Sequence, residues 1–368
     1  MPPDRLLIIN HAVDLGGAER TLLDLLDHLD RDRFSPAVAC PHEGPLTAEL
    51  ARRSIPLHFG HPRPRLLDIK RQSLGTSPLA PLAYPLDLAL TVRDLAALIR
   101  RERFDLVYTN SAKADVYGSL AGRLAGRPVV WRLHDIVGPA AFSRLNLMLF
   151  RLAATHLTDR VLAVSGVVRD ALVGLGVPAA KVGLVHNGIA TTRPQVATDR
   201  PAVRAAWNLP ADAPLVGMVG RLVAWKGPDV FLQAAAKIAA ARPEARFMLV
   251  GDAIYGEQDY VDRLKALATD LGIGERTVFT GFRTDVDELV AAMDVLVHAS
   301  TEPEPFGLVI IEAMHQGVPV VATRAGGVLE IVDDGRTGLL AAPGDPGAHG
   351  PGPRAARPSP RASTSGKK

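Results

Sequence analysis

The chain has 368 residues, of which 47% are hydrophobic and 22% are charged, and its net charge is +3. This length exceeds what one ordinary core requires and predicts two domains of a globular protein. The small net charge and the aromatic content of 5% argue against nucleic-acid binding, which favours a strongly basic surface or many stacking rings.

Short apolar runs alternate with amphipathic stretches in the first half of the chain. We expect a buried strand at 5–10, a helix at 18–29 with leucines at helical spacing, and a strand at 36–40. Four further strands are expected, at 104–110, 128–134, 160–165 and 181–188. This alternation is typical of a parallel sheet with helices on both faces, and it defines a first α/β domain over residues 1–190.

A break in this alternation separates two series of strands. Residues 191–213 carry Pro, Thr and Asp and no strand pattern, so we interpret them as a linker with a short helix. A second domain is expected over residues 214–346, with strands at 214–220, 246–251, 277–282, 294–300 and 319–323. The sequence therefore predicts two doubly wound α/β domains that face a cleft, with ligands beyond the carboxyl ends of the strands.

Two segments lie outside this alternation. Residues 60–86 are basic and rich in Pro, and we expect a long excursion from the first domain that is either a solvated loop or a contact for substrate or membrane. Residues 347–368 show no periodicity and no large apolar residue, so a disordered tail is predicted.

Small and polar residues follow two of the predicted strands in the first domain. Gly16 and Gly17 stand between a strand and a helix, where the backbone can approach an anion, although an ordinary turn explains the pair equally well. His134 and Asp135 stand at the end of another strand. His134 could hydrogen-bond a sugar or move a proton, although a lone histidine is more often structural. No second histidine lies at metal-ligand spacing from His134, so no metal site is expected.

Two cations bracket the loop after the first strand of the second domain. Arg221 and Lys226 precede Gly227 and Pro228, and a proline in the first turn is a helix start signal. Arginine offers a planar fork and lysine a point charge, which together suit a diphosphate at the carboxyl end of a parallel strand. A pair of solvated surface cations is the alternative.

The segment EPEPFGLVIIEAMHQG at 302–317 places one acid before a predicted helix and another inside it. Glu304 lies in the turn, and the helix is expected to begin near Phe306. Glu312 lies about 12 Å further along the helix axis, which is about the separation between the hexose and the ribose of a nucleotide sugar. We therefore interpret Glu304 as a ligand of sugar hydroxyls and Glu312 as a ligand of the ribose diol.

Backbone groups of the same segment complete the predicted site. The N–H groups of Phe306, Gly307 and Leu308 would add donors at the positive end of the helix, and Gly307 leaves room for a close approach. A capping acid and an exposed acid in mid-helix are the alternative. An idle carboxylate between Ile311 and Ala313 would, however, be costly to bury.

Taken together, these segments resemble the retaining glycosyltransferases of family 4, which have the GT-B fold of two Rossmann-like domains. The resemblance rests on GGAER at 16–20, GRLVAWKG at 220–227 and the E-x7-E spacing of Glu304 and Glu312, and it covers about residues 5–345. VSGVVRDAL at 164–172 and HNGIA at 186–190 are similar to further family segments, although Ala190 stands where the family usually has an acid.

The resemblance implies that the first domain binds an acceptor and that the second binds a UDP- or GDP-sugar. A hexosyl or N-acetylhexosaminyl group would be transferred to an acceptor hydroxyl with retention of the anomeric configuration. Arg221 and Lys226 match the diphosphate-binding pair of the family, Glu304 matches the acid at the donor sugar, and Glu312 matches the acid at the ribose. No metal and no cofactor is implied, because the cations and the helix end would take the charge of the leaving diphosphate.

The resemblance also assigns residues of the first domain. Gly16 and Gly17 match the loop that closes over the phosphates, and His134 matches a histidine near the transferred sugar. Family members continue with long helices beyond the position of Pro346, where this chain has a tail rich in Pro, Ser and Arg. The C-terminal helices are therefore expected to be missing or replaced. Two alternatives to a transferase stay open, namely a sugar-nucleotide epimerase of the GT-B fold and an inactive nucleotide-sugar binder.

The acceptor and the location in the cell are less constrained. A lipid-linked glycan, a cell-surface polysaccharide and a small natural product are all compatible acceptors. Arg144 and Arg151, which stand beside apolar residues in 142–153, are compatible with peripheral membrane contact. The single cysteine, Cys40, excludes an internal disulfide, and neither a signal peptide nor an apolar run of membrane-span length is present. We expect a cytoplasmic protein that acts at the inner face of the membrane if it binds lipid.

Overall fold

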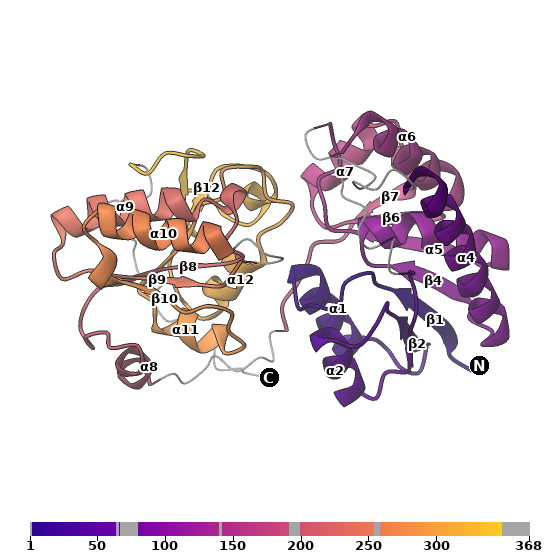
Figure 1. The fold of residues 1–368 in the computed structure, drawn as a ribbon, viewed down its shortest axis with the longest axis horizontal. Coiled ribbons are helices and arrows are strands. Elements are labelled where there is room, and N and C mark those ends of the chain that lie inside the picture. The colour runs from indigo at the N-terminus through magenta and orange to yellow at the C-terminus, as the bar shows by residue number, and fades with distance from the viewer. Residues whose placement is uncertain are drawn as a thin grey trace, which may run out of the picture. The chain divides into compact units, whose positions relative to one another are not determined.

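The computed structural model describes residues 2–63, 66, 80–139, 142–190, 199–253 and 258–347. The chain divides into two compact units, Met1–Ile189 and Ala190–Lys368, and each is described by itself (Figure 1). The predicted tail lies outside the described residues apart from Gly347, and so does most of the predicted excursion at 60–86.

The first unit is built on a parallel sheet of seven strands. Their order is β3-β2-β1-β4-β5-β6-β7, so the chain starts in the middle and winds outward in both directions. The bounds are β1 Asp4–Ile9, β2 Phe34–Ala39, β3 Leu57–His58, β4 Leu106–Thr109, β5 Val129–Leu133, β6 Arg160–Ala163 and β7 Val182–Leu184. The predicted strands of this domain are confirmed, and β3 is an addition whose two residues are too few to form a recognisable apolar run.

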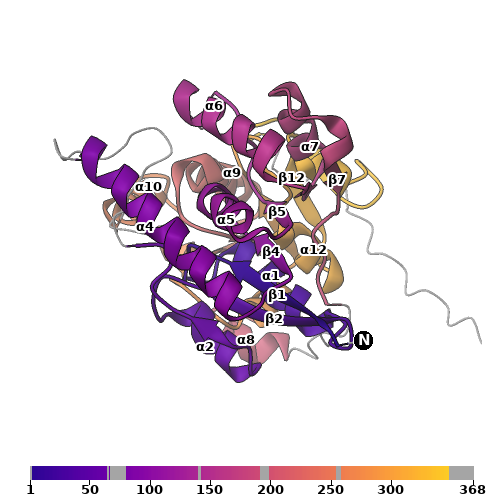
Figure 2. The ribbon, with the colours of Figure 1, turned by 90° about the vertical axis from the view of Figure 1, so that its right-hand side faces the viewer.

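Helices cover the sheet of the first unit. They are α1 Gly17–His28, α2 Pro45–Arg52, α4 Ala80–Arg101, α5 Ala112–Ala125, α6 Arg144–Leu152 and α7 Gly166–Gly174. Leu22 and Leu26 of α1 pack with Leu46 and Leu50 of α2 against β1 and β2, as the leucine spacing predicts. Helix α4 runs alongside α5 (Figure 2), and it includes residues 80–86, which the sequence assigned to an excursion.

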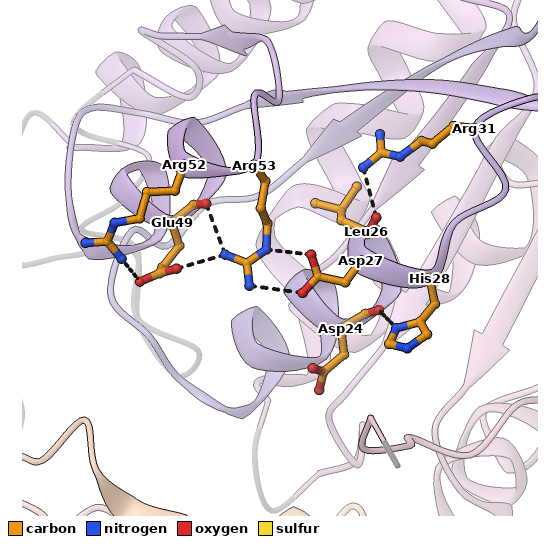
Figure 3. Close-up of polar contacts among 8 residues, drawn as sticks. All are labelled: Asp24, Leu26, Asp27, His28, Arg31, Glu49, Arg52 and Arg53. Atoms are coloured by element: carbon orange, nitrogen blue, oxygen red, sulfur yellow. Dashed lines mark hydrogen bonds and ion pairs between the residues drawn. The ribbon is translucent and has the colours of Figure 1, made fainter. Parts of the chain in front are cut away.

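A salt-bridged arginine joins α1 to α2 on the surface (Figure 3). Arg53, directly after α2, donates from Nε and Nη2 to the two carboxylate oxygens of Asp27 on α1, at 2.7 and 3.0 Å. Its Nη1 donates to Glu49 Oε2 at 2.8 Å. The fork geometry of the guanidinium group suits this double pairing, which raises the pKa of Arg53 and lowers that of Glu49. This contact fixes the helix whose first turn carries Gly16 and Gly17.

The second unit is built on a parallel sheet of six strands in the order β10-β9-β8-β11-β12-β13. The bounds are β8 Leu215–Val219, β9 Arg246–Val250, β10 Thr277–Phe279, β11 Val295–His298, β12 Val320–Thr323 and β13 Leu339–Ala341. The strand order reverses between β8 and β11, which is where ligands of doubly wound sheets bind. The five predicted strands are confirmed, and β13 is an addition.

Two apolar layers enclose this sheet. The helices are α8 Arg200–Ala206, α9 Pro228–Ala241, α10 Gln258–Asp270, α11 Val286–Ala292 and α12 Leu308–His315. Phe231 of α9 and Leu264 of α10 belong to the core on one face, and Leu289 of α11 and Ile310 of α12 belong to the core on the other (Figure 1). The predicted doubly wound α/β architecture is therefore confirmed for each unit.

The short helix that the sequence predicts within the linker at 191–213 is α8, Arg200–Ala206. Helix α8 packs against α11, and Arg204 on α8 is 4% exposed. Its guanidinium group donates to the carbonyl oxygens of Ala292 and Ala213 and to Asp294 Oδ2 at distances from 2.9 to 3.1 Å. These long-range bonds make α8 part of the second unit.

Candidate functional site

The loops that follow β8 and β11 are joined at the carboxyl edge of the second sheet. The N–H of Thr301 donates to the carbonyl oxygen of Trp225 at 2.8 Å. Gly227 adopts a φ of 68°, and a Cβ atom at this position would lie 2.1 Å from the carbonyl oxygen of Ala299. Only glycine tolerates both the left-handed backbone and this close approach. The two loops are therefore in contact, and this contact brings together side chains that are far apart in the sequence.

Lys226 and Glu304 form an ion pair across these loops, with side chains that are 16% and 10% exposed. The Lys226 Nζ atom also lies 4.4 Å from the centre of the Trp225 ring. Burial alone would raise the pKa of Glu304, but the charge of Lys226 and the nearby His298 imidazole, whose Nε2 lies 3.7 Å from Glu304 Oε2, outweigh it and hold this pKa well below its usual range. Glu304 is therefore an anion at any physiological pH.

Two residues that the sequence interpretation missed support the second carboxylate oxygen of Glu304. Ser300 Oγ donates to Glu304 Oε2 at 3.1 Å and lies 3.2 Å from His298 Nε2. His298 Nδ1 is buried and has no hydrogen-bond partner among the described residues. The signal was present in the sequence, because His298, Ser300 and Glu304 are polar residues at the end of an apolar strand.

A pair of glycines after β12 holds the backbone of Glu304. The N–H of Gly327 donates to the carbonyl oxygen of Glu304 at 2.7 Å. A Cβ atom on Gly326, whose φ is 65°, would lie 2.2 Å from that same oxygen. The sequence interpretation did not single out this pair, although adjacent glycines after a strand often mark a close backbone approach.

The remaining residues of the predicted donor segment lie around the start of α12. The helix begins at Leu308, two residues later than predicted, because Gly307 adopts a left-handed φ of 108° and serves as its N-cap. Phe306 is buried, and Glu312 is 9% exposed. The burial of Glu312 contradicts the alternative of an exposed acid in mid-helix.

Arg221 lies on the same loop as Lys226 and is exposed. Its guanidinium carbon lies 5.8 Å from the centre of the Trp225 ring, so the indole contacts both cations. A pocket of about 210 Å³ opens further along this edge of the sheet, after β8, β9 and β10, and Leu222, Gly251 and Gly281 are among its lining residues. Two cations and a pocket thus lie beyond the carboxyl ends of neighbouring strands.

The predicted residues of the first unit lie at the carboxyl ends of β1 and β5. Gly16 precedes α1, and its N–H donates to Glu19 Oε2 at 3.2 Å, while Gly17 is the exposed first residue of the helix. His134 Nε2 lies 3.1 Å from Asn110 Oδ1. Burial, and then the charge of Arg132, lower the pKa of His134 to about 4, so the imidazole is neutral at pH 7.

No group of three or more potential metal-ligating side chains occurs among the residues that the structure describes. In the same residues, no helix is long and apolar enough to cross a membrane.

Comparison with protein families identifies the class. Residues 15–193 match the model described as Glycosyltransferase Family 4, and residues 199–349 match the model described as Glycosyl transferases group 1. The fold of two doubly wound domains is that of the GT-B glycosyltransferases. The chain belongs to glycosyltransferase family 4, as the motifs around Gly16, Lys226 and Glu304 predicted.

Solved structures support this assignment. The chain is 34% identical to Anabaena HepE in its complex with UDP and glucose, with a TM-score of 0.77, and the match covers 93% of this chain and 87% of HepE. HepE has also been solved with UDP-glucose, and that match has the same identity and TM-score.

Curated relatives are enzymes of glycan and small-molecule glycosylation. A lipopolysaccharide core biosynthesis glycosyltransferase, LpsE of Rhizobium meliloti, is 36% identical over 208 residues, which are 56% of each chain. A D-inositol 3-phosphate glycosyltransferase of Streptomyces avermitilis is 33% identical over 261 residues, which are 67% of this chain and 56% of the relative. The chain thus spans little more than half the length of these relatives.

Proposed function

We propose that this protein transfers a hexosyl or N-acetylhexosaminyl group from a nucleotide-diphosphate sugar to an acceptor hydroxyl, with retention of the anomeric configuration. The observation that carries the proposal is the buried pair of Lys226 and Glu304 at the reversal of strand order in the second sheet. A fixed cation and a fixed anion at this edge suit a ligand with both a diphosphate and sugar hydroxyls.

Each predicted residue of the second unit has a role in this proposal. Arg221 and Lys226 take the charge of the leaving diphosphate, together with the N–H groups of Phe306, Gly307 and Leu308. Glu304 accepts hydrogen bonds from hydroxyls of the donor sugar, and Glu312 accepts them from the ribose diol. The pocket lined by Leu222, Gly251 and Gly281 receives the base.

The pairing of Lys226 with Glu304 has a consequence for donor binding. Without a ligand, the carboxylate neutralises the ammonium group. A diphosphate brings two or more negative charges, so Lys226 turns toward it and leaves Glu304 Oε1 open to a sugar hydroxyl. Phosphate binding therefore prepares the sugar-binding acid. No metal ion is part of this proposal.

In the first unit, Gly16 and Gly17 close over the phosphates and His134 contacts the transferred sugar. His134 is neutral at pH 7, so it acts by hydrogen bonding to a hydroxyl and not as a cation. His134, Glu304, Arg221 and Lys226 are the proposed catalytic residues.

UDP-glucose is the first donor to test, because HepE, which is similar over most of this chain, has been solved with UDP and with UDP-glucose. A thermal-shift screen of UDP, GDP and their sugars should show the largest stabilisation with one UDP-sugar. Nucleotide release with an acceptor, and the anomeric coupling constant of the product by NMR, then test transfer and retention. A free epimeric UDP-sugar would indicate an epimerase, and binding without turnover would indicate an inactive binder.

The acceptor that we propose is a cell-surface glycan or its lipid-linked precursor, at the inner face of the membrane. Helix α6 supports this proposal, because Leu145, Met148, Leu149 and Leu152 follow helical spacing on one face and are each about half exposed. The helix carries Arg144 and Arg151 and no acid, so anionic headgroups would complement it.

Membrane contact through α6 can be tested by sedimentation with vesicles. Wild-type protein should bind vesicles that contain phosphatidylglycerol, and Leu149→Asp should abolish binding. Leu124→Asp on α5 is the matched control, since Leu124 is 51% exposed and lies on another helix of the same unit. Equal binding by the two variants would exclude α6 as the contact.

A further inference from the structure

A chain of hydrogen bonds crosses the carboxyl edge of the first sheet. Asn10 follows β1 and Asn110 follows β4, while His134 follows β5, and these strands are neighbours in the order β1-β4-β5. Asn110 Nδ2 donates to Asn10 Oδ1 at 3.1 Å, and Asn10 Nδ2 donates to Glu19 Oε1 at 3.2 Å. At the other end, Asn110 Oδ1 lies 3.1 Å from His134 Nε2. Asn10 and Asn110 are 0% and 2% exposed.

The direction of every bond in this chain is determined by groups that only accept. Asn10 Nδ2 faces the Glu19 carboxylate and the carbonyl oxygen of Ala12, at 2.7 Å, so the amide of Asn10 has one orientation. Its oxygen therefore faces Asn110 and requires a donor there. Asn110 Nδ2 is that donor and also reaches the carbonyl oxygen of Ala18 at 3.3 Å. The oxygen of Asn110 is left for the imidazole, so the hydrogen must lie on His134 Nε2.

We propose that Asn110, oriented by Asn10 and Glu19, is a positioning residue that holds His134 in the Nε2–H tautomer and so presents Nδ1 as an acceptor for a ligand hydroxyl. Among the described residues, His134 Nδ1 has no hydrogen-bond partner. The proposal rests on the proposed function, in which His134 contacts the transferred sugar.

This arrangement selects for one kind of ligand group. A neutral imidazole with a bare Nδ1 accepts a hydrogen bond from a hydroxyl and repels a phosphate or carboxylate oxygen, which has no hydrogen to give. The other oxygen of Glu19 accepts the N–H of Gly16. The same carboxylate thus caps α1 behind the glycine turn and sets the polarity of the chain that ends at His134. A Cβ atom on Gly16 would lie 2.8 Å from this carboxylate oxygen, so any other residue there would require the Glu19 carboxylate to shift.

The tautomer of His134 can be determined by NMR in the absence of substrate. Long-range ¹H–¹⁵N NMR of the full chain labelled on histidine distinguishes a protonated from a bare ring nitrogen, and His134→Gln identifies the signal. We expect Nε2 protonated and Nδ1 bare at pH 7. The Nδ1–H tautomer or a charged ring would overturn the proposal. Because this readout needs no turnover, it can succeed or fail whether or not the protein proves to be a glycosyltransferase.

Variants of Asn110 test whether this residue orients the His134 ring or only contributes to the stability of the fold. Asn110→Ala should give mixed tautomers of His134 and lower kcat/KM for the donor by about tenfold, as expected for one misplaced hydrogen bond. Asn110→Asp keeps an acceptor for Nε2–H but leaves the oxygens of Asn10 and Ala18 without their donor, so it should retain the Nε2–H tautomer at a cost in stability.

Ser119→Ala is the matched control. It removes the acceptor of Trp131 Nε1, at 2.6 Å, and that bond is equally buried in the same unit but not connected to His134. It should leave the tautomer unchanged. An unchanged tautomer in Asn110→Ala would overturn the proposal, and if that variant fails to fold, the wild-type spectrum still decides the tautomer.

Discussion

Lys226 and Glu304 are 78 residues apart in the sequence, and their side chains form a buried ion pair at the carboxyl edge of the second sheet. A buried pair of this kind adds little net stability as a whole, but removal of one partner leaves an uncompensated charge. The pair is therefore accessible to experiment through stability as well as through ligand binding.

The first prediction concerns the pH dependence of stability. The folded-state pKa of Glu304 lies below its unfolded-state value, so its stabilising contribution is present above the unfolded pKa of about 4.3 and is lost as the pH falls below it. Glu304→Gln should lower the free energy of unfolding by about 3 kcal/mol at pH 7. The difference from wild type should shrink as the pH is lowered from 5 to 3.

Urea unfolding at several pH values measures this difference. Glu302→Gln is the control, since Glu302 is exposed in the same turn and its substitution should change little. A gap between wild type and Glu304→Gln that stays constant down to pH 3 would contradict the ionised state of Glu304.

The second prediction concerns the diphosphate. Lys226→Met should weaken UDP binding by about tenfold to a hundredfold, because a charge-assisted hydrogen bond is lost. Binding of uridine, which has no phosphates, should be unaffected. Calorimetry with both ligands tests this, and Lys237→Met, an exposed lysine on α9, is the control. An equal loss for UDP and uridine would exclude a diphosphate role for Lys226.

The third prediction concerns the ribose. If Glu312 accepts hydrogen bonds from the ribose diol, wild-type protein should prefer UDP to 2′-deoxy-UDP by about tenfold. Glu312→Ala should remove this preference by weakening only the binding of UDP. The ratio of the two dissociation constants is the measurement. A preference that survives in Glu312→Ala would place the ribose elsewhere.

The fourth prediction concerns α8. Arg204→Ala should lower the free energy of unfolding of the second unit by about 3 kcal/mol, because it leaves the buried carbonyl oxygen of Ala213 without its donor and takes both Arg204 donors from that of Ala292. Arg200→Ala, one turn earlier, removes a half-exposed partner of Asp294 and should cost less than 1 kcal/mol. Similar losses in the two variants would show that α8 is not held by Arg204.

Much of the fold could be predicted because its strands are continuous apolar runs. The runs at 5–10 and 214–220 are buried on both faces of their sheets, so their composition alone identifies them. Strands β3 and β13 escaped prediction because two or three residues form no pattern. The short helix α8 was expected, but its packing onto the second unit was not, because this packing depends on one buried arginine that binds the carbonyl oxygen of Ala292, which is distant in the sequence.

The individual residues of the candidate site could be predicted from the sequence, but most of the contacts between them could not. Lys226 and Glu304 were each recognisable from the residues around them, yet nothing local indicates that they contact each other. His298 and Ser300 were missed because a polar residue at a strand end has many possible partners. Asn10 and Asn110 were missed for the same reason, since their hydrogen bonds depend on the order of strands in the sheet.

Strands β8 and β11 have a different set of contacts at each end. Asp294, just before β11, accepts a hydrogen bond from the N–H of Leu215 at the start of β8 and is bound by Arg204 of α8. The opposite ends of β8 and β11 lead into the loops of Lys226 and Glu304. Helix α8 is the first described helix after the chain leaves the first unit at Ile189. The same two strands therefore connect α8, at their amino ends, to the ion pair of Lys226 and Glu304 at their carboxyl ends, so the anchoring of α8 and the geometry of the site depend on one element of the second unit.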